Sequence, residues 1–219
     1  MSIAANIKRI KTELPENVTL VAVSKTKSNN EILEAYKAGQ RVFGENKIQE
    51  MTQKWSELPK DIEWHMIGHV QRNKVKYMAA YVALIHGVDS LKLLKEINKQ
   101  AKKEQRVIPC LLQVHIAEEE TKFGFDWPEL KALIDSRVLK ELENVQIKGL
   151  MGMATFTENT EQIRKEFKTL SEKYQVLRKE LPDITELSMG MSGDYSIAIE
   201  EGSTMVRIGS SIFGARNKT

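Results

Sequence analysis

The sequence predicts an α/β fold: a single (β/α)8 barrel of the TIM type over residues 1–219, with an extra helix at the N-terminus. Eight short apolar runs alternate with longer charged stretches, and this alternation indicates βαβ units and a parallel sheet. Eight such units in 219 residues favour a closed barrel. An open Rossmann-like sheet is the alternative, but no Gly-x-Gly-x-x-Gly motif follows the first strand.

The predicted elements follow from apolar spacing and from residues that begin or end helices. Apolar residues recur at helical spacing between residues 3 and 14, which predicts an amphipathic N-terminal helix. Ser90 begins one later helix, and Gly39 and Gly202 end two others. Strands are expected at 18–24, 40–44, 62–67, 82–86, 108–115, 145–151, 185–188 and 204–208. Helices are expected at 30–39, 47–58, 71–79, 90–105, 127–141, 161–181 and 195–202.

Composition and charge narrow the class of protein. The chain is 41% hydrophobic and 29% charged, which is typical of a soluble globular protein, and its net charge is +3 without a basic block. Nucleic-acid binding therefore has little support, and the basic helix at 71–79 reads as a solvated face. The N-terminus lacks the apolar core of a signal peptide, and no run approaches a transmembrane length. We expect a cytoplasmic protein without a membrane or nucleic-acid partner.

Cysteine and histidine give no sign of a metal site. Cys110 is the single cysteine, which excludes an intramolecular disulfide and a cysteine-rich zinc site. It lies in an apolar strand, so we expect a buried thiol in a reducing compartment. Gly-x-Ser-x-Gly is absent, which removes support for an esterase. The four histidines lack metal-ligand spacing; they are His65, His69, His86 and His115.

The first predicted strand ends in a lysine, Lys25, after an apolar and β-branched run. Lysine is among the residues that are least often buried. Partial desolvation at the mouth of a strand would lower its pKa and leave the amine able to attack carbonyl groups. The alternative is that the strand ends there and the side chain points into water. In a barrel, functional residues gather at the carboxyl ends of the strands, where Lys25 lies.

Two glycine-rich clusters follow the seventh and eighth strands, where barrels often bind phosphate. They are residues 189–194, just before a helix, and residues 209–211. Glycine allows close approach of the backbone, and N–H groups at the start of a helix bind anions. The alternative is a helix cap by Ser192 or Asp194 and a terminal turn. Arg207 ends an apolar strand; pointing inward it would bring a fixed charge into the barrel, and pointing outward it would be solvated.

Six segments, taken in order, resemble one family over nearly the whole chain. They are residues 21–26, 43–46, 65–74, 149–151, 188–194 and 207–214. The family is that of the pyridoxal phosphate homeostasis proteins, the YggS/PROSC group, whose fold is similar to the barrel domain of alanine racemase. Two positions depart from the family pattern: His69 stands where proline or a small residue is more common, and Ser210 replaces a common threonine but keeps the hydroxyl group.

The resemblance implies a role for each candidate site residue toward pyridoxal 5′-phosphate (PLP). Lys25 would form a Schiff base with the aldehyde, and Arg207 would face the pyridine nitrogen. Asn46 would lie near the ring. The phosphate would be held by Ser192, Gly209 and Ser210. Met191 is also expected at the cofactor, whereas packing in the core is the ordinary role of Met151, Met153 and Met189.

The same residues argue for little or no turnover. An electron sink needs a protonated pyridine nitrogen, which a charged arginine would oppose. Racemisation also needs a second acid–base group. Alanine racemases take it from an additional C-terminal domain, and this chain ends at Thr219. We therefore expect no catalytic residue and a monomeric protein of vitamin B6 homeostasis, with PLP-dependent apoenzymes as candidate recipients. The alternative is a PLP-dependent amino-acid racemase; a second carrier lysine, Lys122 or Lys140, stays open.

Overall fold

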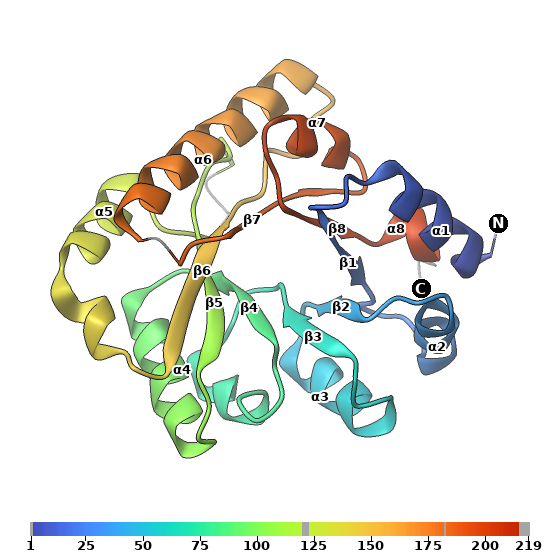
Figure 1. Ribbon diagram of the computed structural model, residues 1–219, viewed down its shortest axis with the longest axis horizontal. Coiled ribbons are helices and arrows are strands. Elements are labelled where there is room, and N and C mark those ends of the chain that lie inside the picture. The colour runs from blue at the N-terminus through green and yellow to red at the C-terminus, as the bar shows by residue number, and fades with distance from the viewer. Residues whose placement is uncertain (1, 120–122, 182, 215–219) are drawn as a thin grey trace.

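Eight parallel strands close into a barrel in the computed structural model, which describes residues 2–119, 123–181 and 183–214 (Figure 1). The strands follow one another around the barrel in sequence order, and β8 pairs with β1 to close it. The predicted α/β barrel is confirmed. The strands are β1 (Thr19–Val23), β2 (Val42–Glu45), β3 (Glu63–Met66), β4 (Leu84–Val88), β5 (Ile108–Gln113), β6 (Val145–Met151), β7 (Glu186–Met191) and β8 (Met205–Ile208).

Helices cover the outside of the barrel (Figure 1). The predicted N-terminal helix is present as α1 and is capped by the Ser2 side chain. Asn6 on this helix donates to the carbonyl of Ile212 at 2.9 Å, which ties α1 to the last helix, α8. The helices are α1 (Ile3–Glu13), α2 (Asn29–Lys37), α3 (Ile48–Glu57), α4 (Leu91–Lys103), α5 (Trp127–Asp135), α6 (Thr160–Glu180), α7 (Tyr195–Glu200) and α8 (Ser210–Phe213), with 3₁₀ helices η1 (Arg72–Tyr77) and η2 (Arg137–Glu141).

Four elements differ from the sequence prediction in kind or by more than two residues at an end. The helix expected at 127–141 is divided, because Ser136 adopts an extended backbone (φ −70°, ψ 145°) between α5 and η2. The helix expected at 71–79 is the 3₁₀ helix η1. Strand β7 extends to Met191, three residues past its predicted end at 188, so part of the expected glycine-rich loop is strand. The chain past β8 forms the short helix α8.

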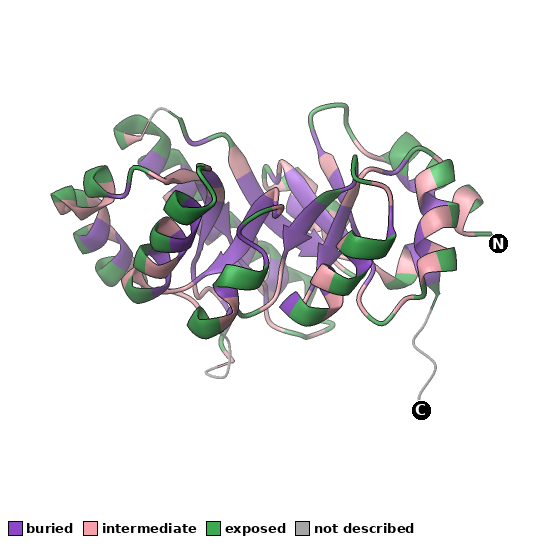
Figure 2. Cartoon of the chain, turned by 90° about the horizontal axis from the view of Figure 1, so that it is seen from below, coloured by how far each residue is buried: buried purple, intermediate pink, exposed green. Residues whose placement is uncertain are grey.

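Two apolar clusters fill the fold. The larger one lies between the barrel wall and the helices, and it includes Leu20 and Ala22 of β1. The smaller one lies inside the barrel; its buried members are Val21, Leu84, Leu111, Met151 and Met205. Figure 2 shows buried strands at the centre and helices with exposed outer faces. Because side chains alternate along a strand, the interior position of Val21 directs Val23, and after it Lys25, to the interior.

Cys110 is fully buried in β5, as predicted, and burial raises the pKa of its thiol. Among residues 2–119, 123–181 and 183–214, none of the helices has the length and apolar character that crossing a bilayer requires.

Candidate functional site

A cavity of about 460 Å³ opens at the carboxyl ends of the strands. Its lining includes all seven residues that the sequence analysis placed at a cofactor: Lys25, Asn46, Met191, Ser192, Arg207, Gly209 and Ser210. These residues come from the last residues of β7 and β8 and from the segments that follow β1, β2, β7 and β8, so the barrel topology brings together positions up to 185 residues apart. Their contact with a cofactor stays a prediction.

Lys25 is half-buried and lines this cavity. It follows β1, and the alternation from Val21 through Val23 directs it inward. Its two neighbours differ from it, since the Ser24 side chain is fully buried on the outer side of the barrel wall and Thr26 is exposed. The structure therefore places the Lys25 side chain at the cavity and not in the outward orientation.

Arg207 points into the barrel, which resolves the two orientations that the sequence left open. It pairs with Val21 on β1 and Met191 on β7 and is only 4% exposed. Its guanidinium group donates to the Ser188 hydroxyl at 2.6 Å and to the Gly152 carbonyl at 3.1 Å. Burial lowers the pKa of Arg207 to about 10, so the side chain keeps its charge at neutral pH. A buried cation with neutral hydrogen-bond partners therefore lines the cavity, together with Lys25 and Lys27.

A chain of polar side chains runs from Arg207 across the barrel interior. His86 Nδ1 lies 3.0 Å from the Ser188 hydroxyl, and His86 Nε2 lies 3.0 Å from His65 Nδ1. Because Ser188 accepts from Arg207, it donates its one proton to His86 Nδ1; His86 then carries its proton on Nε2 and donates to His65. Burial lowers the pKa of His65 to about 3 and that of His86 well below 6.5, so both rings are neutral. We call His65, His86, Ser188 and Arg207 the interior chain.

Three members of the interior chain, His65, His86 and Ser188, were not predicted as site residues. His65 and His86 were considered only as metal ligands, and Ser188 only as part of a motif. A signal was present, since histidine on an apolar strand is a polar side chain that needs a buried partner. The partners, however, lie 21 and 102 residues away, and only the barrel register brings them together.

The two predicted glycine-rich clusters are joined by a hydrogen bond. The N–H of Gly209 donates to the Ser192 hydroxyl at 3.1 Å. Within the first cluster, the N–H of Met191 donates to the Asp194 carboxylate at 2.5 Å. Gly190 has a φ of +95°, and a Cβ atom there would lie 2.6 Å from the Cβ of Ala198 on α7, so glycine is required. The turn after β7 is thereby held against the loop after β8.

Asn46 is held at the rim by a close approach of two loops. A Cβ atom at Gly68, after β3, would lie 2.4 Å from the carbonyl oxygen of Asn46. Only glycine allows this contact between the loops after β2 and β3. Asn46 is half-buried and lines the cavity.

The loop between β6 and α6 supplies lining residues that the sequence analysis did not identify, Thr155, Phe156 and Thr157. Both the N–H and the hydroxyl of Thr155 donate to the Glu166 carboxylate at 2.7 Å, which fixes this loop to α6. Phe156 is 96% exposed at the rim.

Some of the methionines and lysines considered in the sequence analysis line the cavity, and others do not. Met151 and Met189 are buried in the apolar clusters, whereas Met153 and Met191 line the cavity. Lys140 is exposed on η2, which leads into the amino end of β6 and so lies away from the cavity. Lys122 lies outside the described residues.

The remaining histidines have ordinary partners. His69, which departs from the family pattern, stacks on Phe123 with a centroid separation of 3.9 Å and contacts Asp89. His115 lies 2.9 Å from the carbonyl of Glu119. In the described part of the chain, no group of histidine, cysteine and acidic side chains is arranged to hold a metal ion.

Known proteins resemble this chain over almost its full length. The family model for the alanine racemase N-terminal domain matches residues 1–217. A pyridoxal phosphate homeostasis protein of Vibrio alginolyticus is 40% identical over 231 residues, covering 99% of this chain and 98% of that one. One of Aquifex aeolicus is 43% identical over 199 residues, covering 90% and 86%.

A solved structure agrees with these relatives. PipY of Synechococcus elongatus PCC7942, determined with PLP bound, superposes with a TM-score of 0.90 at 36% identity and covers 97% of this chain and 100% of its own. The chain therefore belongs to the alanine racemase N-terminal domain family and, within it, to the pyridoxal phosphate homeostasis proteins.

Proposed function

We propose that this protein binds PLP through a Schiff base on Lys25 and serves vitamin B6 homeostasis by holding the cofactor with little or no turnover. The observation that carries the proposal is one cavity of about 460 Å³ bordered by a half-buried lysine and a buried arginine. The relatives' names and the PLP-bound state of PipY support it. We further propose one barrel domain over residues 1–219, acting as a cytoplasmic monomer with PLP-dependent apoenzymes as recipients.

The cavity lining fits the three chemical features of the cofactor. PLP supplies an aldehyde, a phosphate and a pyridine ring. Nζ of Lys25 would attack the aldehyde carbon, so that a C=N bond forms and one water molecule leaves. The hydroxyl groups of Ser192 and Ser210, together with the backbone at Gly209, would hold the phosphate. Asn46 and Met191 would contact the ring.

Arg207 accounts for the low turnover that we propose. Its pKa of about 10 leaves it charged at neutral pH, and its two hydrogen bonds to neutral acceptors leave further N–H donors of the guanidinium group for a ring nitrogen. A fixed positive charge at that nitrogen opposes its protonation. Without that proton the ring withdraws electrons weakly from a carbanion.

Reductive trapping tests the role of Lys25. Purified protein is mixed with PLP, reduced with borohydride and mapped by peptide mass spectrometry. We expect the label on Lys25 and complete loss of that label in Lys25→Ala. Lys27→Ala is the matched control, since Lys27 lines the same cavity and should leave the label in place. A label that persists elsewhere at full yield in Lys25→Ala would show that the lysine is misassigned.

Proton exchange tests the absence of turnover. The PLP-loaded protein is incubated with D- or L-alanine in deuterated water, and the α-proton signal is followed by NMR. We expect no exchange beyond that of free PLP. Sustained exchange at catalytic rates would contradict the holding role and favour a racemase.

A further inference from the structure

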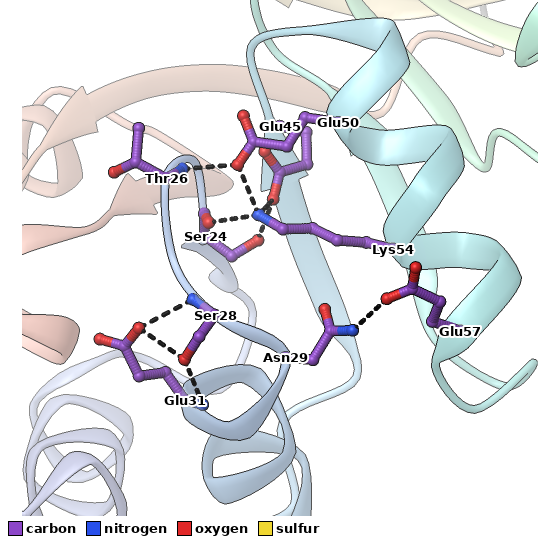
Figure 3. Close-up of polar contacts among 9 residues, drawn as sticks. All are labelled: Ser24, Thr26, Ser28, Asn29, Glu31, Glu45, Glu50, Lys54 and Glu57. Atoms are coloured by element: carbon purple, nitrogen blue, oxygen red, sulfur yellow. Dashed lines mark hydrogen bonds and ion pairs between the residues drawn. The ribbon is translucent and has the colours of Figure 1, made fainter.

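A second polar cluster lies behind Lys25, on the outer side of the barrel wall, and consists of the buried Glu45 and Lys54 and the partly exposed Glu50 (Figure 3). We propose that these three residues, called the outer clamp, are positioning residues that hold the peptide on both sides of Lys25 and so direct its amine into the cavity. This inference rests on the proposed function of Lys25. The described residues that line the cavity do not include any of the three.

The clamp holds Ser24, on the N-terminal side of Lys25, through two contacts. The Lys54 ammonium donates to the Ser24 carbonyl at 2.8 Å. The Ser24 hydroxyl donates to Oε1 of Glu45 at 2.6 Å. Ser24 and Glu45 are fully buried, so water does not compete for these bonds. The last residue before Lys25 is therefore fixed through both its backbone and its side chain.

The clamp holds Thr26, on the C-terminal side, through its backbone. The N–H of Thr26 donates to Oε1 of Glu50 at 2.6 Å. Thr26 has a φ of +65°, a left-handed conformation that a β-branched residue adopts only under constraint from its surroundings. The hydrogen bond that the Thr26 N–H donates to the charged Glu50 carboxylate supplies such a constraint. It holds the chain in the sharp turn that follows Lys25.

Lys54 joins the two sides of the clamp. It projects from α3, is 5% exposed, and donates to Oε1 of Glu45 at 2.8 Å and to Oε1 of Glu50 at 2.7 Å. With the bond to the Ser24 carbonyl, its three N–H donors have three acceptors. Figure 3 shows these contacts converging on the Lys54 nitrogen. Lys54 therefore acts as a fixed hub.

The cluster carries a cost that simple packing would not require. In the described part of the chain, Oε2 of Glu45 is buried without a hydrogen-bond partner. Burying charged groups is expensive, and apolar side chains of similar volume often stabilise a fold as well or better. What the charged cluster supplies, and apolar packing would not, is a set of directional bonds to the residues before and after Lys25. This points to positioning as its role.

Three variants on α3 test the clamp. Glu50→Ala removes the acceptor of the Thr26 N–H, whereas Glu50→Gln keeps an oxygen there. Glu57→Ala is the matched control: Glu57 lines the same outer hollow of about 500 Å³ but contacts Asn29 and not the residues beside Lys25. If Glu50→Ala does not fold by circular dichroism, Glu50→Asp, whose shorter side chain withdraws the acceptor, replaces it.

The first readout is hydrogen exchange of the Thr26 amide in protein without cofactor, followed by NMR. We expect exchange about tenfold faster in Glu50→Ala, the effect of losing one hydrogen bond to a charged group. In Glu50→Gln and Glu57→Ala, the Thr26 amide should exchange at a rate close to that of the unmodified protein. A Thr26 amide that already exchanges at the rate of an unprotected amide in the unmodified protein would overturn the proposal.

The second readout is the rate at which Lys25 takes the borohydride-trapped PLP label. We expect a decrease of about tenfold in Glu50→Ala, rescue in Glu50→Gln and no change in Glu57→Ala. A native labelling rate in Glu50→Ala, together with fast Thr26 exchange, would overturn the positioning role alone. Absence of label on Lys25 in the unmodified protein would instead contradict the proposed function, and this inference with it.

Discussion

The interior chain and the outer clamp lie on opposite sides of the barrel wall, and they handle a buried cation differently. Arg207 donates to two neutral acceptors, the Ser188 hydroxyl and the Gly152 carbonyl. The carboxylate of Asp194 only partly offsets the effect of burial on its pKa. Lys54 has all three donors engaged, two of them by carboxylates. The first cation borders the cavity, and the second does not.

The difference shows how one fold separates binding from support. A buried cation with neutral partners keeps charge and donors available for a ligand, and its desolvation is a standing cost. A cation whose N–H donors are all engaged has no donor available for a ligand, but it fixes the backbone geometry around it. The first arrangement borders the cavity, and the second lies behind Lys25, the residue that we propose it positions.

The largest expected effect comes from breaking the outer clamp at its hub. Lys54→Met leaves the Glu45 carboxylate buried without its cation, and we expect the free energy of unfolding to fall by about 3–5 kcal/mol in chemical denaturation. The double variant Glu45→Gln/Lys54→Met removes both charges and should recover part of the loss. A loss below about 1 kcal/mol would mean that the clamp behaves like an exposed ion pair.

Acid should act on the two regions with opposite sign. The pKa values of His65 and His86 lie below 6.5 in the fold, so the unfolded chain binds more protons between pH 6.5 and 4.5. The free energy of unfolding should therefore fall as pH falls, by about 1 kcal/mol per pH unit for each histidine. Burial raises the pKa of Glu45, so its protonation at falling pH favours the folded state.

Equilibrium unfolding at a series of pH values measures the fall in the free energy of unfolding. NMR of the imidazole nitrogens shows whether His65 and His86 cause it. At pH 5 we expect His65 and His86 to be neutral, each with its proton on Nε2, as the direction of the interior chain requires. Protonated rings at pH 5, or stability that does not change between pH 6.5 and 4.5, would contradict this account of the interior.

The smallest effect concerns the strained turn beside the clamp. Thr26→Gly removes the steric cost of φ +65° and should raise the free energy of unfolding by about 1 kcal/mol, while slowing the labelling of Lys25 because the turn becomes looser. Gln105→Gly is the matched control, since Gln105 also has a positive φ, of 54°, and lies far along the chain after α4. Gln105→Gly should stabilise the protein without changing the rate at which Lys25 is labelled. Equal slowing of Lys25 labelling in both variants would contradict a specific role of the turn at Thr26.

The strands could be predicted from the sequence because each is buried on both faces. Such strands appear as continuous apolar runs, which can be identified without knowing which strand pairs with which. All eight predicted strands are present. The convergence of Lys25 and Arg207 followed from topology, since every strand of a parallel barrel ends at the same face. The direction of Arg207 did not follow, because it depends on pairing with Val21, which a single strand does not reveal.

Two further features depend on information that local patterns lack. The break between α5 and η2 arises from the extended backbone at Ser136, within a stretch whose spacing is still helical. The outer clamp joins β2 and α3 to the segment after β1 through three charged side chains that, taken one at a time, look like ordinary surface charges. The burial of Glu45 and Lys54 becomes visible only when α3 lies against the barrel.

The saturated hub has a consequence for how the protein discriminates among its own amines. Lysines 25, 27 and 54 surround one short turn, and an electrophile reacts with a nitrogen only through an available lone pair. Lys54 has every N–H engaged and is nearly excluded from solvent, while Lys27 is occupied by the Phe213 carbonyl and Glu31. If Lys25 carries the aldehyde as we propose, the engagement of Lys27 and Lys54 limits competition from the two neighbouring amines.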